Sequence, residues 1–153
     1  MSIEYRRAAL EQLELLVATR VEVLRAANDL SDDADMSAVA AESRAYYAEA
    51  LADGSHTGYL AFDGDRVVGA GGVSYYKVMP TYHNPTGRKA YIMNMYVAPD
   101  RRRRGIATVL LDLLMADIRR RGVESVSLEA TEMGRPLYEK YGFVAMEHEM
   151  EWP

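Results

Sequence analysis

A short arginine-rich stretch links an apolar run to a helical pattern that opens at a glycine. Residues 93–108 read MNMYVAPDRRRRGIAT, with four consecutive arginines directly before Gly105. Backbone amides in the first turn of a helix lack partners and carry partial positive charge, and a glycine there lets an anion approach closely. Arginine side chains add charge and paired donors. This combination predicts a binding site for a pyrophosphate or a similar small anion.

The stretch differs from the common phosphate-binding fingerprints. No Gly-Lys-Ser/Thr follows, as it does in nucleoside triphosphatases, and the three glycines of the dinucleotide fingerprint are missing. The pattern Arg102-x-x-Gly105-x-Ala107 instead resembles a signature of the GNAT superfamily of acetyl-CoA-dependent N-acyltransferases. A second signature of that superfamily, Leu-Tyr-x-x-x-Gly-Phe, is present at residues 137–143 (LYEKYGF). The resemblance extends over the whole chain and is greatest to small bacterial members with Asn-Met-Tyr before the anion site.

The resemblance implies a fold, a cosubstrate and a reaction. The expected fold is α/β, a GNAT-like mixed, mostly antiparallel central sheet flanked by helices on both faces, with residues 1–153 as a single domain. Acetyl-CoA is the expected cosubstrate, and no metal is expected. A primary amine of a small molecule or peptide attacks the thioester directly, so that no protein nucleophile is needed. A homodimer is common in such folds.

The same resemblance assigns roles to individual residues. Strand residues pair with the pantetheine arm, a strand N–H stabilises the oxyanion, and the turn with the first helical residues holds the pyrophosphate. The residues so assigned are Met95, Tyr96, Val97, Arg102, Arg103, Arg104, Gly105, Ile106, Ala107 and Thr108. Tyr138 is the implied general acid, because a phenol with a pKa of ~10 can protonate a leaving thiolate of comparable basicity.

Two positions depart from the superfamily pattern. Thr131 stands seven residues before Tyr138, where asparagine is common, and is the corresponding candidate for a cofactor contact. Asn94 lies on the strand where many members carry a glutamate that deprotonates the amine, and an amide cannot act as a base. Asn94 is therefore a candidate catalytic position that lacks a base. Glu129 on the next strand and Glu132 just after it are the candidate substitutes.

Composition narrows the function classes. The 153 residues include 18 basic and 23 acidic side chains, which gives a net charge of −5. An acidic chain with one arginine cluster does not resemble nucleic-acid-binding proteins, whose positive charge covers a broad face. Cysteine is absent, which excludes disulfides and thiolate chemistry, and the three histidines lack metal-ligand spacing. With no apolar run of about 20 residues and no signal peptide, a cytoplasmic protein that does not bind membranes is expected.

Periodicity predicts the elements that position these residues. Helices are expected at residues 10–28, from a cap at Ser37 to a stop at Gly54, at residues 105–121, and from Pro136 to Gly142. Strands are expected at residues 3–8, 58–62, 67–78, 90–97, 123–130 and 143–150, with a hairpin turn at residues 63–65. The first two helices and a long loop at residues 79–89 are expected to build the acceptor pocket.

Three function classes follow from these observations. An N-acetyltransferase uses both the anion site and Tyr138, whereas a non-catalytic acyl-CoA-binding sensor of the same fold needs only the anion site. A nucleic-acid-binding module that uses the arginines is the third class, and the acidic balance argues against it. Plainer roles stay open: Tyr138 could only pack beside Tyr141, and Met93, Met95 and Met133 are interpreted as core residues.

Overall fold

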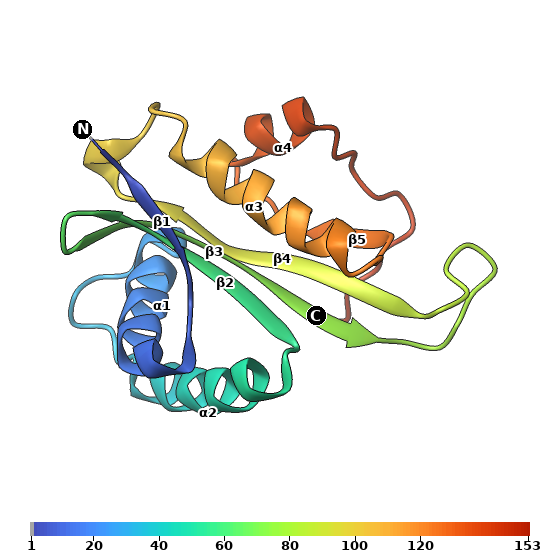
Figure 1. Ribbon diagram of the computed structural model, residues 1–153, viewed down its shortest axis with the longest axis horizontal. Coiled ribbons are helices and arrows are strands. Elements are labelled where there is room, and N and C mark those ends of the chain that lie inside the picture. Colours follow the sequence, from blue (N-terminus) through green and yellow to red (C-terminus); the bar gives the residue numbers. More distant parts are fainter. Residues whose placement is uncertain (1) are drawn as a thin grey trace.

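The computed structural model describes residues 2–153 and is built around a five-stranded sheet (Figure 1). The strands lie in chain order and are β1 (Glu4–Arg7), β2 (His56–Asp63), β3 (Arg66–Lys77), β4 (Arg88–Val97) and β5 (Ser125–Leu128). Strands β1 to β4 pair antiparallel, and β5 runs parallel to β4. The mixed, mostly antiparallel sheet expected from the sequence is confirmed.

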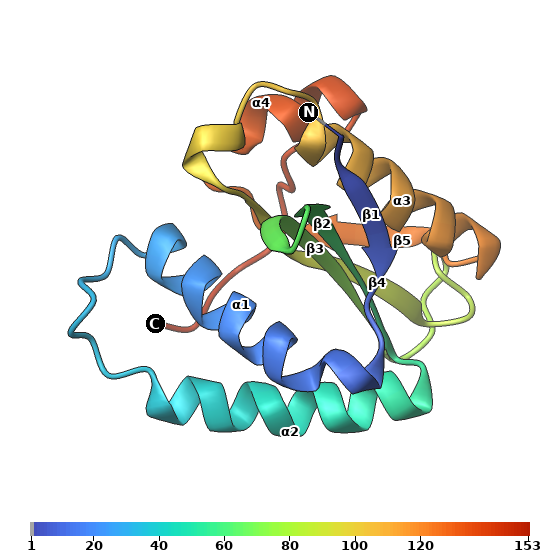
Figure 2. The same ribbon diagram turned by 60° about the vertical axis from the view of Figure 1, so that its left-hand side comes forward.

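Helices cover both faces of the sheet, as Figures 1 and 2 show. One face carries α1 (Leu13–Ala27) and α2 (Ser37–Asp53), and the other carries α3 (Ile106–Arg120) and α4 (Arg135–Tyr141). Two short 3-10 helices, η1 (Leu10–Gln12) and η2 (Pro99–Arg101), precede α1 and follow β4. Within residues 2–153, none of the helices has the length and apolar character needed to cross a bilayer.

Glycines in β3 let side chains on both faces approach the sheet closely. A Cβ at Gly69 would lie 3.0 Å from the side chain of Ile106 on α3. On the opposite face, a Cβ at Gly72 would lie 2.9 Å from the ring of His56. Any larger residue at these positions would displace α3 or the His56 ring. Gly69 therefore lets α3 lie close to the sheet, and Gly72 leaves room for the His56 ring on the other face.

Two of the predicted local structures are wrong. Residues 143–150 form no regular element, and Val144 and Met150 are 86% and 95% exposed. Alternating apolar residues favour a strand, but a strand also needs a neighbour, and no strand of residues 2–153 pairs with the outer edge of β5. Ser37 does not cap α2 but is its first residue, and its amide donates to Asp35 Oδ1 at 2.9 Å. The Asp35 carboxylate is a stronger acceptor than a serine hydroxyl at this position, because its negative charge also interacts favourably with the positive end of the helix dipole.

A buried carboxylate ties the C-terminal end of α3 to the sheet. Asp117 is 1% exposed and accepts hydrogen bonds from Tyr75 (2.6 Å), Arg7 (3.1 Å) and Arg120 (2.6 Å). Burial alone would raise the pKa of Asp117, but these hydrogen bonds and one from Thr57 hold it at about 2. The carboxylate therefore joins α3 to β1, β2 and β3 and is ionised at neutral pH.

We expect Asp117→Asn to lower the free energy of unfolding at pH 7 by roughly 2 kcal/mol or more, because a folded pKa well below the unfolded value stabilises the native state. This contribution is complete above the ordinary pKa of 3.8 and is lost as pH falls toward the folded pKa of about 2. Urea unfolding followed by circular dichroism between pH 7 and pH 3 should show the difference from wild type shrinking on acidification.

Asp112→Asn is the matched control, because Asp112 lies exposed on the same helix. We expect it to change stability by less than about 0.5 kcal/mol. An Asp117→Asn deficit that stays constant across the pH range would contradict the assignment of this stabilisation to an ionised carboxylate.

Candidate functional site

A bulge interrupts β4 near the middle of the sheet. Asn94 and Met95 together lie opposite the single residue Gly71 of β3. Asn94 has a φ of 63°, a left-handed conformation that asparagine tolerates better than most residues. A bulge of this kind bends the strand and redirects its side chains. Strand β5 pairs with β4 only as far as Ile92, so residues 93–97 have no neighbouring strand on that edge.

The N-terminus of α3 is open in the same region. Gly105 is its N-cap, with a φ of 82° and no side chain to accept a hydrogen bond. The amide of Val109 donates to the Gly105 carbonyl at 3.1 Å, so the amides of residues 106–108 precede the first helical hydrogen bond. Arg103, just before the helix, also has a left-handed φ of 63°. Left-handed residues in a turn direct successive amides to one side and form anion-binding concavities.

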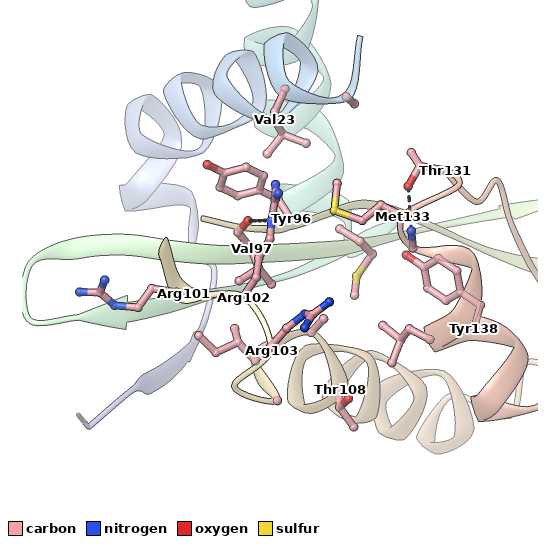
Figure 3. A pocket seen from close by; sticks show the side chains of 18 residues that line it. Val23, Tyr96, Val97, Arg101, Arg102, Arg103, Thr108, Thr131, Met133 and Tyr138 are labelled. Carbon is pink, nitrogen blue, oxygen red and sulfur yellow. Dashed lines mark hydrogen bonds between the residues drawn. The ribbon is translucent and has the colours of Figure 1, made fainter. Parts of the chain in front are cut away.

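The free edge of β4 and the first turn of α3 border one cleft of about 630 Å³ (Figure 3). Val23 from α1 lines another wall, and the segment from Thr131 to Tyr138 contributes a third. Figure 3 shows Arg101 directed away from the cleft, where it pairs with Asp63 at 2.7 Å. The cleft thus lies where the sheet opens between β4 and β5, with helices on either side.

Most of the residues assigned from the sequence meet in this cleft. Those lining it are Met95, Tyr96, Val97, Arg102, Arg103, Gly105, Ile106, Ala107, Thr108, Thr131 and Tyr138. Arg104, Asn94 and Glu129 are not among the lining residues. Asn94 instead lines a second cavity of about 250 Å³ beside α1 and α2. Glu129 is exposed and lies next to Tyr91, whose pKa is raised by burial and by the Glu129 carboxylate.

Several lining residues were not predicted from the sequence. Ala26 and Ala27 at the end of α1 are small enough to leave room for a ligand. Met133, interpreted as a core residue, is 67% exposed and lines the cleft. Its position in a polar turn, outside any periodic element, is the signal that could have revealed this. The expected contribution of residues 79–89 is wrong, because this loop projects beyond the far end of the sheet and lines neither cavity (Figure 1).

Tyr138 combines a fixed ring with an available hydroxyl. The residue is 7% exposed and its ring lies against Phe143, with the centroids 6.1 Å apart. Within residues 2–153 the hydroxyl forms no hydrogen bond, although Tyr138 lines the cleft. Burial raises the pKa of Tyr138, so the phenol is protonated at neutral pH. Figure 3 shows its ring extending from α4 toward the turn of Thr131, whose Oγ1 accepts the Gly134 amide at 3.1 Å.

Positive charge in the cleft comes from Arg102 and Arg103. Both are exposed, and neither forms an ion pair with a carboxylate within the described chain. Arg102 Nε donates to the Val97 carbonyl at 3.3 Å, drawn as a dashed line in Figure 3. The arginines are therefore held beside the open helix end and remain able to bind an anion. No group of three or more histidine or acidic side chains in residues 2–153 is arranged to hold a metal.

Known proteins have the same fold and are similar to this chain in sequence. The family model for Acetyltransferase (GNAT) matches residues 24–143. A predicted acetyltransferase from Clostridium acetobutylicum, solved with acetyl-CoA, is 32% identical with a TM-score of 0.91, over 99% of this chain and 96% of that one. A GCN5-related N-acetyltransferase from Ralstonia eutropha JMP134 is 31% identical with a TM-score of 0.84, over 99% and 98%. No curated protein gives a significant match.

The fold, the cleft and these matches together define an acyltransferase. The chain belongs to the GNAT acetyltransferase family, as the two sequence signatures predicted. A more distant structure, an aminoglycoside acetyltransferase from an uncultured soil metagenomic sample, is 23% identical with a TM-score of 0.70 and shares the fold.

We expect Gly105→Glu to weaken acetyl-CoA binding at least tenfold, or about 1.4 kcal/mol, because it places a carboxylate at the open N-terminus of α3. Isothermal titration calorimetry measures this directly. Gly54→Glu is the matched control: Gly54 has a φ of 80° against 82° for Gly105, and a Cβ at either position meets nothing within 4 Å. The two variants carry similar backbone strain, so equal affinities would contradict an anion site at Gly105.

Proposed function

We propose that the protein is an N-acetyltransferase that transfers the acetyl group of acetyl-CoA to a primary amine of a small molecule or peptide. One observation carries the proposal: the unpaired edge of β4, the uncapped first turn of α3 and the Tyr138 hydroxyl all border one cleft. Each of these three features matches a different part of the acetyl donor.

Acetyl-CoA is a substrate that supplies the thioester, and the residues of the cleft fit its parts. The amides of residues 106–108, with Arg102 and Arg103 beside them, are suited to the pyrophosphate. The amide groups of a pantetheine arm can pair with residues 95–97 as an added strand would. An acidic side chain would repel these phosphates, and none lines the cleft within residues 2–153.

The chemistry needs an acid and a positioned carbonyl but no protein nucleophile. The amine nitrogen bonds to the thioester carbon while the carbon–sulfur bond breaks, and the sulfur takes the electron pair. The Tyr138 hydroxyl gives its proton to this thiolate, and solvent later restores it. A backbone N–H of residues 95–97 stabilises the oxygen as negative charge develops on it. The absence of cysteine is consistent with this direct transfer.

The proton of the amine needs a separate acceptor. Asn94 has no basic group, and its side chain is held by Arg20 (3.2 Å) and directed toward Tyr47 (3.4 Å). We propose Glu129, acting through water, as the acceptor. It lies beside Tyr91, and Tyr91 alternates with the core residues Ala90 and Ile92, so it faces the α1–α2 side of the sheet. Glu129 is therefore on the side that carries the second cavity.

A second candidate function is a non-catalytic acyl-CoA-binding sensor. The observation that favours it is that no carboxylate or histidine of residues 2–153 lines the large cleft, so a directly placed base is missing. Such a sensor would bind acetyl-CoA through the same surfaces and would not transfer its acetyl group.

We expect Tyr138→Phe to lower kcat by roughly 10²-fold, because it keeps the ring but removes the proton donor. Acetyl-CoA affinity should stay within about twofold. Release of the CoA thiol measures turnover without protein background, since the chain has no cysteine. Tyr141→Phe, on the same helix but outside the cleft, is the control. A wild-type protein that binds acetyl-CoA but acetylates no amine would favour the sensor.

We expect Glu129→Gln to lower kcat/KM at neutral pH and to recover much of the loss as pH rises toward the pKa of the amine, ~10.4 for an alkylamine. The recovery follows because a deprotonated amine needs no base. Glu132→Gln is the comparison, since Glu132 lies three residues further along the chain. Parallel pH profiles for wild type and Glu129→Gln would exclude Glu129 as the base.

A further inference from the structure

The second cavity adjoins the large cleft across the β4 bulge. Asn94 lines the second cavity and the next residue, Met95, lines the cleft. On α1 the same division occurs one turn apart, with Arg20 facing the second cavity and Val23 the cleft. A molecule in the second cavity therefore lies next to the part of β4 where the proposed function puts the thioester.

Arg20 carries the distinctive charge of this cavity. Its side chain donates to Asn94 Oδ1 at 3.2 Å, and within residues 2–153 no carboxylate lies within ion-pair distance of it. By contrast, Arg44 on the neighbouring helix α2 pairs with Glu14 of α1 at 2.7 Å. A guanidinium has five N–H donors in a planar fork, so Arg20 has donors left for a carboxylate.

Three aromatic side chains form much of the remaining wall. His56 is 5% exposed, and burial, with the Arg20 charge, lowers its pKa to about 4, so it is neutral at physiological pH. The Tyr46 hydroxyl lies 2.8 Å from His56 Nδ1 and 2.5 Å from Ser74 Oγ. The rings of Tyr46 and Tyr47 each meet the His56 ring edge-on at 5.3 Å. This neutral wall leaves Arg20 as the cation lining the cavity.

Glu42 supplies the opposite charge. It lines the same cavity from the exposed side of α2, beyond ion-pair distance of Arg20. A purely anionic ligand would be repelled by Glu42, whereas a zwitterion, whose net charge is zero, would not be. Because Arg20 is bonded to Asn94, a carboxylate held by Arg20 would keep a neighbouring amino group beside the bulge.

We propose that this cavity binds the acceptor and that Arg20 selects amines carrying a carboxylate close to the amino group, as α-amino acids do. The inference rests on the proposed N-acetyltransferase function and names its substrate class. The guanidinium fixes the carboxylate, and the amino group beside it then faces residues 94 and 95. The cavity volume of about 250 Å³ is sufficient for a compact molecule of this kind.

The test compares α-amino acids with their carboxamides, which keep the amine and the side chain but lack the carboxylate. For wild type, kcat/KM should be higher for the acids. Arg20→Gln should lower kcat/KM at least tenfold for the acids and by less than about twofold for the amides, while Arg20→Lys should keep part of the preference. The acid-to-amide ratio is the readout, because the intrinsic reactivity of each amine is the same for all variants.

Arg25→Gln is the matched control, since Arg25 lies on α1 but donates to the Ser31 carbonyl outside the cavity (2.7 Å). It should leave the acid-to-amide ratio unchanged. Circular dichroism and acetyl-CoA titration show whether each variant is folded. Arg20→Gln losses of equal size for acids and amides, or a wild type without preference for acids, would overturn the proposal.

Product binding separates this proposal from the proposed function. Calorimetry with CoA-loaded protein compares N-acetyl amino acids with N-acetyl amino-acid amides and needs no turnover. Tighter binding of the acids, abolished by Arg20→Gln, supports the carboxylate site even if catalysis is slow. Equal binding of the two products, or binding of neither, overturns the carboxylate site while intact acetyl-CoA affinity leaves the acetyl-donor site standing. Failure to bind acetyl-CoA itself counts against the proposed function.

Discussion

The left-handed turn at Asn94 is the constraint on which both cavities depend. A regular strand would place consecutive side chains on alternate faces and would let β5 pair along the whole of β4. With two residues opposite Gly71, the alternation is broken: the consecutive residues Met93 and Asn94 both line the cavity beside α1 and α2, and Met95 then lies under α3. The strands separate after Ile92. One extra residue thereby produces an open edge and two adjoining spaces.

A helix that presents its N-terminus to a ligand needs to be anchored elsewhere. In α3 the anchors are apolar contacts along its length and the buried Asp117 near its C-terminal end. Leu110 and Leu114 lie over β3, where the glycines allow the helix to sit close to the sheet. The uncapped amides at residues 106–108 are thus exposed to ligand without the helix being free to shift. Because the C-terminal half of α3 is held in place, its first-turn amides can remain free for a ligand without destabilising the position of the helix.

Features that depend on neighbouring residues could be predicted from the sequence. Features that depend on contacts between distant segments could not. Gly54 and Gly105 correctly marked a helix end and a helix start, because positive φ angles favour glycine whatever the surroundings. The turn at residues 63–65 was correct for the same reason. The bulge could not be predicted, since it is defined by pairing with β3. The strand expected at residues 143–150 failed because alternation says nothing about whether a partner strand is present.

Of the two cavities, one could be predicted from the sequence and the other could not. The cleft could be predicted because the turn proposed to bind the pyrophosphate is contiguous in sequence, from Arg102 to Thr108. The second cavity combines α1, α2 and three strands, and Arg20 and His56 are isolated residues in their own segments. Neither carries a spacing pattern that would set it apart. Their significance comes from the tertiary structure, which brings a guanidinium with no carboxylate partner in residues 2–153 near a neutral imidazole.

The exposed C-terminal segment has an optical consequence. Trp152 is the single tryptophan of the chain and is 95% exposed. Indole emission therefore reports the water around the end of the chain, and its spectrum in the native protein should resemble that of the unfolded chain. The chromophores that sense the interior are tyrosines such as Tyr47 and Tyr138, which are 4% and 7% exposed. Loss of the core is thus visible in tyrosine near-ultraviolet dichroism while the tryptophan fluorescence stays almost unchanged.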